Sequence, residues 1–391
     1  MSFNRKLWLL IAAGTGIRLV VSFTTTGVLF DIDSYEQVLN GWRAHHFHFY
    51  ETTATAQWPY PPGYLPWVLV AGKLVHFFDF GNVIRWGAII ADAGLVWLVQ
   101  DLLRRAGADE NRRLLGAALI ALGPVSIGVA GFNGQVDPAA TLPAVAAYWV
   151  WTRPGQRHRG WGAGALIGLA GSLKTVPLFL AWPVACDAKT PREGASVLAG
   201  AAVVFLVILA PFALASHAAI DNITGYQGVP GWGGLSLLIE PRWAANLLHH
   251  QVGGNESLIL DLKTNGKYVL MPAIGVMSLF LVWRRPDALT GICLMYLTIY
   301  VFGVSFFISY LVWALPFLVV RGHFKAVTAL QFGLAPAQIA VFIYDLPLWV
   351  AYLVYTLSLA VVWFAFAGAL GRFLIQERLL QRRGLVDGYH E

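Results

Sequence analysis

The chain has 391 residues, of which 57% are hydrophobic and only 12% are charged. A water-soluble core cannot hold that much apolar surface, so the composition predicts a polytopic membrane protein. The net charge of +6 does not indicate nucleic-acid binding, because the basic residues stand in short clusters between apolar runs, where they act as topology signals. The two cysteines, Cys186 and Cys293, have neither disulfide nor zinc-site spacing, and we expect both to be small core residues.

The first predicted span covers residues 7–25 and follows the basic pair Arg5-Lys6. It resembles a signal peptide in outline, but it lacks a small-x-small cleavage site and contains Arg18, so we expect a retained anchor. Three acidic residues come soon after it, in the stretch Asp31-Ile32-Asp33-Ser34-Tyr35-Glu36. This stretch opens a polar region rich in histidine and aromatic residues, which leads to the apolar segment 64–80.

The positive-inside rule orients the later spans. Arg104 to Arg113 reaches the cytoplasm only if 64–80 does not cross the membrane, so we expect that segment to be an interfacial or re-entrant helix. Spans are then predicted at 7–25, 82–103, 114–131, 138–153, 160–173, 175–187, 195–216, 267–283, 288–304, 305–320, 325–344 and 347–371. About twelve crossings would place both termini in the cytoplasm, within a single integral membrane domain, 1–391.

Two features of this topology matter for function. The pair 160–187 is short and is interrupted at Lys174-Thr175-Val176-Pro177, so it fits either two crossings or a broken, re-entrant pair. Three stretches share the external side: the first loop 26–81, the turn 131–138 and the large loop 217–266. Most acids and histidines that flank the membrane lie there, so we expect the functional site to be external.

Asp31 and Asp33 are the first candidates. Carboxylates at a membrane exit are often solvated caps, and in nucleotide-sugar enzymes such a pair holds a metal under a diphosphate. The metal role fits poorly here, because nucleotide sugars are cytoplasmic and this loop is predicted to be external. General-base work remains open, in which one carboxylate takes a proton from a hydroxyl and the other orients the base or the acceptor.

The turn that carries Asn133, Gln135 and Asp137 is the second candidate. A plain turn with Pro138 at the first position of the next helix explains these residue types equally well. The candidate phosphate contacts are the cations Lys174, at the helix break, Arg18 and Arg242. His249 and His250 in the large loop are weaker candidates, since histidines in such loops are usually surface groups. Snorkelling is the alternative role for Lys174, and pairing with a loop carboxylate is the alternative for Arg18.

Five short motifs in this order resemble the membrane-embedded C-type glycosyltransferases (the GT-C superfamily), which use polyprenyl- or dolichyl-phosphate sugars. The resemblance is closest to the branch of glycosylphosphatidylinositol mannosyltransferase I and the bacterial polyprenyl-phosphomannose-dependent mannosyltransferases. It covers about residues 10–320. The motifs are Asp31-Ile32-Asp33, Tyr60-Pro61-Pro62, Asn133-Gly134-Gln135-Val136-Asp137, Leu173-Lys174-Thr175-Val176-Pro177 and Ser309-Tyr310-Leu311-Val312-Trp313-Ala314-Leu315-Pro316.

The resemblance implies an all-α fold and the transfer of a sugar, most closely mannose, from a lipid phosphate to an acceptor hydroxyl with inversion. It implies Asp33 as the general base, with Asp31 as its helper and Asp137 as a further supporting acid. No cofactor is implied, and a divalent metal stays an open alternative. The implied contacts to the donor phosphate are Lys174, Arg242 and Arg18. The implied contacts to the substrates are Asn133, Gln135, Asp137, Tyr60, His249, His250 and Tyr310.

The partners implied are the polyprenyl-phosphate sugar, a lipid-linked or glycan acceptor and membrane lipids, in a bacterial or archaeal plasma membrane. Two alternatives remain open. A transporter or lipid flippase also has many spans, broken helices and charges at membrane depth, although no inverted repeat is visible in this sequence. The third possibility is a non-catalytic subunit of the same fold, which the presence of Asp31, Asp33 and Lys174 disfavours.

Overall fold

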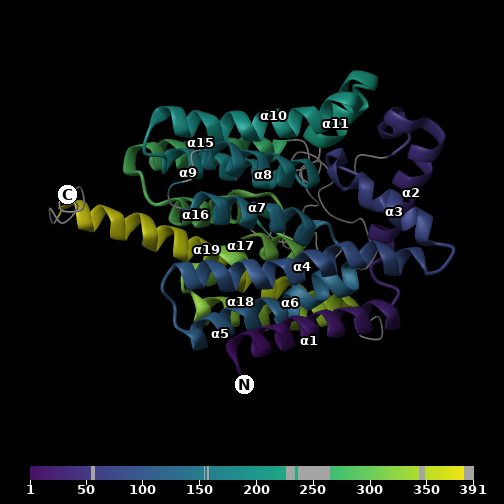
Figure 1. Ribbon diagram of the computed structural model, residues 1–391, viewed down its shortest axis with the longest axis horizontal. Helices are drawn as coiled ribbons and strands as arrows, with labels where there is room; N and C mark the ends of the chain where they lie inside the picture. Colours follow the sequence, from purple (N-terminus) through teal and green to yellow (C-terminus); the bar gives the residue numbers. More distant parts are fainter. Residues whose placement is uncertain are drawn as a thin grey trace.

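The structure is a computed structural model that describes residues 1–53, 58–153, 155, 158–225, 234–236, 265–342 and 348–382. Within these ranges the chain forms helices and no strand (Figure 1). The longer helices are α1 (Phe3–Thr24), α4 (Phe80–Arg105), α10 (Pro191–Ala215), α15 (Lys267–Arg284), α18 (Phe324–Phe342) and α19 (Leu348–Arg382). The shorter ones are α2 (Leu29–His45), α3 (Leu65–Leu74), α5 (Glu110–Ala121), α6 (Pro124–Ile127), α7 (Asp137–Trp151), α8 (Arg159–Leu173), α9 (Ala181–Cys186), α11 (Ala218–Gly225), α16 (Ala288–Phe302) and α17 (Leu311–Val320).

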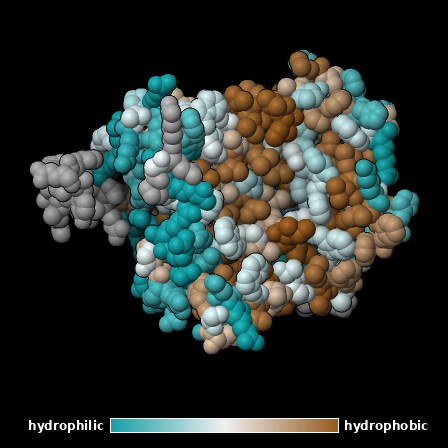
Figure 2. All heavy atoms as spheres, in the orientation of Figure 1, coloured by the Kyte–Doolittle hydropathy of each residue, from teal (hydrophilic) through white to brown (hydrophobic). Residues whose placement is uncertain are grey.

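Several helices have the length and apolarity of membrane spans. Among the described residues, α1, α4, α10, α15 and the part of α19 at Leu353–Ile375 qualify alone, and Glu110–Ala121 with Pro124–Asn133 qualifies as a pair bent by 41°. Figure 2 shows hydrophobic side chains spread over the middle of the visible face and hydrophilic ones gathered toward its left. These five or six candidate spans and the all-helical chain confirm the predicted all-α, polytopic membrane fold, whereas the number of about twelve crossings stays a prediction.

Several arginines that follow or precede the predicted spans, among them Arg105, Arg159 and Arg321, lie at one end of the bundle. They join the ends of different helices, in the pairs Arg105 with the Trp149 carbonyl (2.9 Å), Arg159 with Glu193 (2.6 Å) and Arg321 with Asp287 (3.6 Å). Arg105 and Arg321 also line one cavity of about 320 Å³ at this end. We refer to it as the arginine-rich end.

The segment 160–187 forms two antiparallel pieces. Helix α8 leaves the arginine-rich end at Arg159 and ends at Leu173, beside the opposite end of the bundle. The 3₁₀ helix η4 (Val176–Leu180) and α9 then lead back, because Trp151 at the end of α7 donates to Asp187 just after α9 (2.7 Å). The break at Lys174 therefore turns the chain at the end opposite the arginines.

Glycines allow α8 and α10 to pack with their backbones close together. A Cβ at Gly164 would overlap the Val197 carbonyl oxygen, and one at Gly168 would overlap that of Ala201. Real Cβ atoms do not approach oxygen so closely, so the pair needs glycine at a four-residue spacing, as membrane helices often do. This contact holds α8, and the lysine that comes after it, at a fixed position.

A layer of short helices covers the end opposite the arginines, at the right of Figure 1. It contains α2, the 3₁₀ helices η1 (His46–Glu51) and η2 (Pro62–Tyr64), and α3. Its own apolar core includes Tyr35, Val38, Trp58 and Val68, all nearly fully buried. With ten residues α3 is about 15 Å long, too short for a hydrocarbon core of about 30 Å. Its length suits a helix that lies in the membrane interface.

Candidate active site

Asp31 and Asp33, which are two positions apart in the sequence, lie on different sides of helix α2. Residues two apart on an α-helix point about 200° apart. Asp33 is exposed, on the same side as the exposed Glu36 and Asn40, whereas Asp31 is partly buried and borders the face that holds buried Tyr35. Only Asp31 therefore faces the rest of the protein.

The polar turn that follows α6 and η3 is buried inside the protein and is not a solvated loop. The chain continues from α6 as the π-helix η3 (Gly128–Asn133) and then turns at Gly134, which has φ +68°. The exposed fractions of Asn133, Gln135 and Asp137 are only 2%, 7% and 0%. A turn that served only to join two spans would leave these polar side chains in water, so the structure favours the functional alternative for this segment.

The turn and α2 meet at Asp31. Gln135 donates a hydrogen bond to the Asp31 carboxylate, and the Tyr35 hydroxyl donates to the Gly134 carbonyl (3.2 Å). Burial raises the pKa of the Asp31 carboxyl to about 7, the Gln135 hydrogen bond opposes that rise, Asp137 adds to it and the charge of Lys174 lowers it. A carboxyl group with a pKa near 7 can accept a proton at neutral pH and release it again.

Lys174 lies behind the turn and pairs with Asp137. The lysine has an extended backbone after the last residue of α8, and its Nζ is 2.7 Å from Asp137 Oδ1. Three aromatic rings surround the ammonium group, with centroids 5.1 Å (Tyr60), 4.9 Å (Tyr310) and 4.9 Å (Trp313) from Nζ. The structure thus brings together Asp31, Gln135, Asp137, Lys174, Tyr60 and Tyr310, all predicted from the sequence.

Two oxygens of this turn are buried without a hydrogen bond. Trp313 Nε1 donates to Asp137 Oδ1 (2.5 Å), but Asp137 Oδ2 has no partner among the described residues, and neither has Asn133 Oδ1. A buried acceptor without a donor costs about 1–3 kcal/mol. Hydroxyl groups of a bound molecule could supply the missing donors.

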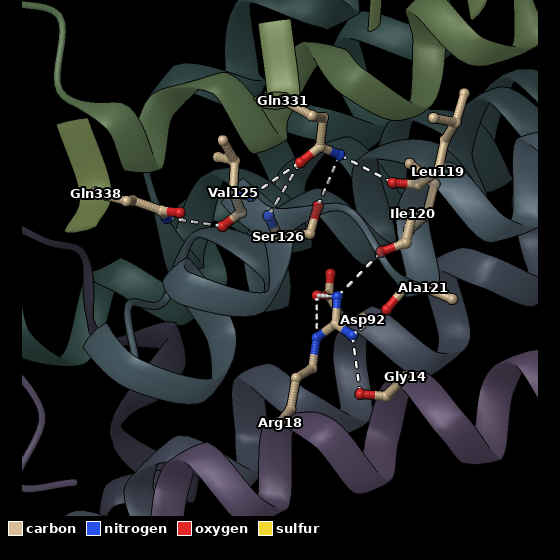
Figure 3. Close-up of polar contacts among 10 residues, drawn as sticks. All are labelled: Gly14, Arg18, Asp92, Leu119, Ile120, Ala121, Val125, Ser126, Gln331 and Gln338. Carbon is tan, nitrogen blue, oxygen red and sulfur yellow. Dashed lines mark hydrogen bonds and ion pairs between the residues drawn. The ribbon is translucent and has the colours of Figure 1, made fainter. Parts of the chain in front are cut away.

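The other predicted site residues lie elsewhere. Arg18 is fully buried in α1 and donates to Asp92 (2.9 Å), to the Gly14 carbonyl and to two carbonyls at the end of α5 (Figure 3). These contacts use its guanidinium inside the protein, so Arg18 is not placed to hold a phosphate of the donor. The remaining predictions, Arg242, His249 and His250, lie outside the described residues.

Arg85 is a site-supporting residue that the sequence reasoning missed. Its guanidinium donates to the carbonyls of Gly81 (2.8 Å), Thr25 (3.0 Å) and Gly131 (3.5 Å) and to the side chains of Thr25 (3.1 Å) and Asn82 (3.0 Å). It therefore joins the end of α1, the start of α4 and the π-helix that precedes the turn. An ionisable residue within the predicted span 82–103 was the available signal, since such residues are seldom without a partner.

Metal ligands are sparse in the part of the chain that the structure describes. There, no three His, Cys, Asp or Glu side chains gather closely enough to hold a metal ion. The charges of Asp31 and Asp137 influence each other, but Lys174 already occupies one oxygen of Asp137. That the reaction proceeds without a metal stays a prediction from the sequence.

Comparison with known proteins shows to which protein family the chain belongs. No curated protein matches the chain significantly. The family model of glycosyltransferase family 87 matches residues 58–309, which is more than half of the chain. The matched range contains the turn and Lys174 and begins after Asp31, so the role of α2 must be argued from geometry. With its helical membrane fold, the chain belongs to glycosyltransferase family 87, a family of GT-C-type membrane glycosyltransferases.

Proposed function

We propose that the protein transfers mannose from a polyprenyl-phosphate carrier to a hydroxyl group of a lipid- or glycan-linked acceptor, with inversion. The family supports glycosyl transfer. The site cluster lies at the bundle end opposite the arginines, and the positive-inside rule assigns that end to the extracytoplasmic face. A lipid-phosphate sugar suits this location, because its tail stays in the bilayer while its sugar reaches the surface. We assign the protein to a bacterial or archaeal plasma membrane, with both termini cytoplasmic.

The observation that carries the proposal is the pairing of Asp31 with the buried turn. Asp31 is the acid that points inward, Gln135 orients it, and its pKa is raised to about 7 by burial. Asn133 and Asp137 on the same turn leave two buried acceptor oxygens without partners among the described residues. A general base next to unsatisfied acceptors suits a substrate rich in hydroxyl groups, as a sugar is.

The proposed step is a single displacement. Asp31 accepts the proton of the acceptor hydroxyl while that oxygen forms a bond to the anomeric carbon of the donor sugar. The bond from this carbon to the phosphate oxygen breaks, and the lipid phosphate leaves with the electron pair. Attack from the face opposite the leaving group inverts a β-linked donor to an α-linked product. Asp31, in place of Asp33, is the proposed base because Asp33 points to solvent.

Lys174 and its aromatic neighbours would shape the sugar pocket. The lysine is 5% exposed and is neutralised by Asp137, so it can contact a phosphate only if that pair loosens. We propose that the pair loosens when the donor binds, so that the ammonium group stabilises the negative charge of the leaving phosphate. Tyr310 and Trp313 are stacked with centroids 4.4 Å apart and would offer a ring face or edge to the sugar.

A donor screen in detergent tests the proposed function. Purified protein is incubated with short-chain polyprenyl-phosphate mannose, glucose or arabinose together with extracted membrane lipids, and glycosylated lipid is detected by mass spectrometry. Mannosylated product is expected in the absence of added metal. Since detergent leaves no separate compartments, product formation excludes a transporter or flippase as the sole function. Absence of product with every donor would contradict the proposal, and activity that EDTA removes and Mg²⁺ restores would contradict its metal-free form.

A further inference from the structure

Helices α5 and α6 form, together with η3, one candidate membrane span that is broken along its length. Helix α5 ends at Ala121, and α6 begins at Pro124 after a bend of 41°. Such a break leaves carbonyl groups of α5 and N–H groups of α6 without their helical partners, and lipid cannot replace them. Side chains from two other helices, α1 and α18, take these positions (Figure 3).

Arg18 of α1 satisfies the end of α5. It donates to the carbonyl oxygens of Ala121 (2.5 Å) and Ile120 (3.0 Å), and Asp92 of α4 balances its charge at 2.8 Å. The side chains of Arg18 and Asp92 are only 3% and 4% exposed. This ion pair therefore serves the break, and every polar contact recorded for Arg18 stays inside the bundle.

Gln331 of α18 bridges the break from the other side. Its Nε2 donates to the Leu119 carbonyl (2.9 Å), and its Oε1 accepts from the backbone N–H of Val125 (3.0 Å). Two helical turns later, Gln338 donates to the carbonyl of Val125 (3.1 Å). A Cβ at Gly123 would overlap the Gln331 amide nitrogen, so glycine makes room for this insertion.

The break between α5 and α6 affects the site because the same stretch of chain leads to the turn. Residues 124–133 continue as α6 and η3, and they end at the Asn133–Asp137 turn of the site. Ten helical residues span about 15 Å, so a bend of 41° moves the far end by about 10 Å relative to a straight helix. The bend thus determines whether the turn reaches Asp31, and an error of even about 1 Å in such a position can lower a rate about 100-fold.

We propose that Arg18, Asp92 and Gln331 are positioning residues that fix the bend between α5 and α6 and thereby hold the Asn133–Asp137 turn against Asp31. Their role in a reaction rests on the proposed transferase function, whereas their control of the turn does not. The family match ends at residue 309, before α18, so the proposal also gives the late helix α18 a part in forming the site.

The test compares two buried glutamines. Gln331→Leu removes the bridge across the break, and Gln100→Leu is the matched control, since Gln100 is also buried (6% exposed, against 0% for Gln331) but accepts from Arg113 near the arginine-rich end. Gln338→Leu, which removes the hydrogen bond to the Val125 carbonyl, is a milder variant in case Gln331→Leu does not fold. Thermal melting of the purified full-length proteins reports the structural cost of each change.

Two readouts separate positioning from mere stabilisation. Hydrogen–deuterium exchange of a peptide covering residues 128–136 should rise in Gln331→Leu, and less in Gln338→Leu, but not in Gln100→Leu. In the transferase assay, Gln331→Leu should lower kcat by about 100-fold. It should also displace the acidic limb of the pH profile, because burial and the hydrogen bond from Gln135 on the turn both act on the pKa of Asp31.

The outcomes are distinguishable. If folded Gln331→Leu and Gln338→Leu exchange like the wild type over 128–136, the positioning proposal is wrong, whatever the activity. If exchange rises but kcat and the pH profile keep their wild-type values, the turn is positioned without consequence for the reaction, and the catalytic part of the proposal is wrong. If exchange rises as expected but wild-type protein transfers no sugar, the structural inference holds and the proposed function fails.

Discussion

Lys174 Nζ and Asp137 Oδ1 lie 2.7 Å apart and join the end of α8 to the start of α7 at the bottom of the candidate site. The side chains are 7% and 0% exposed, so neither charge has water as an alternative partner. Removal of one member of such a pair leaves an uncompensated buried charge, which costs about 3–5 kcal/mol. The pair is therefore expected to be a structural element of the site as well as an electrostatic one.

Lys174→Met should lower the melting temperature of the purified protein markedly, because Asp137 is left buried and unpaired. The double variant Lys174→Met/Asp137→Asn should recover much of that stability, since it removes both charges, but it should not recover transfer activity. Arg112→Met is the control: Arg112 and Asp109 are 70% and 65% exposed, so their contact should contribute little. Equal melting temperatures for Lys174→Met and Arg112→Met would contradict this account.

The pH dependence of transfer should report Asp31. Its pKa is raised by burial to about 7, and only the ionised carboxylate can accept a proton. Accordingly kcat/KM should rise with pH through an apparent pKa near 7 and level off above it. The measurement is a pH series with a fixed donor and acceptor. A flat profile between pH 5 and 8, with the chemical step limiting the rate, would show that no group with this pKa is required.

Gly134→Ala should disrupt the turn through two effects. Gly134 has φ +68°, and a Cβ there would lie 2.5 Å from Arg85 Cγ, within the buried support of the site. Gly107→Ala is the matched control, because Gly107 has φ +78° and its Cβ would meet nothing within 4 Å. Both variants should lose about 1–2 kcal/mol from the left-handed backbone, but only Gly134→Ala should also lose most transfer activity. Equal activity in the two variants would rule out the crowding effect.

Much of the fold could be predicted from the sequence because the apolar runs are long and the arginine clusters mark their ends. The turn at Asn133–Asp137 and the break at Lys174 were also recognisable, since polar residues next to Gly and Pro between apolar runs are unusual. The family resemblance implied that Tyr60 and Tyr310 belong to the same site. Trp313 lies in one of the motifs, but no role was predicted for it. In the structure, all of these residues contact Lys174 or adjoin its partner.

The orientation of the two aspartates on α2 and the partner of Arg18 were not predicted from the sequence. Helical periodicity over 29–45 would have placed Asp33 with Glu36 and Asn40 on a polar face, and thus Asp31 on the inner side. Arg18 was considered as a phosphate contact or as the partner of a loop carboxylate, because it is a charge within an apolar span. Its partner in the structure, Asp92, is 74 positions away in another span. The packing of helices decides which charges from distant spans form pairs inside a bundle. The periodicity of a single span carries no information about this packing.

The central claim is that Asp31, not Asp33, is the general base, and the direct measurement compares kcat for Asp31→Asn and Asp33→Asn in the same transfer assay. Both changes keep the size of the side chain and remove one charge from α2. Asp31→Asn should lower kcat by about 10²- to 10⁴-fold, the range typical of a lost general base. Asp33→Asn should stay within about threefold of the wild type, because an exposed side chain typically changes such properties little. Near-normal turnover in Asp31→Asn, or its abolition in Asp33→Asn alone, would contradict the account.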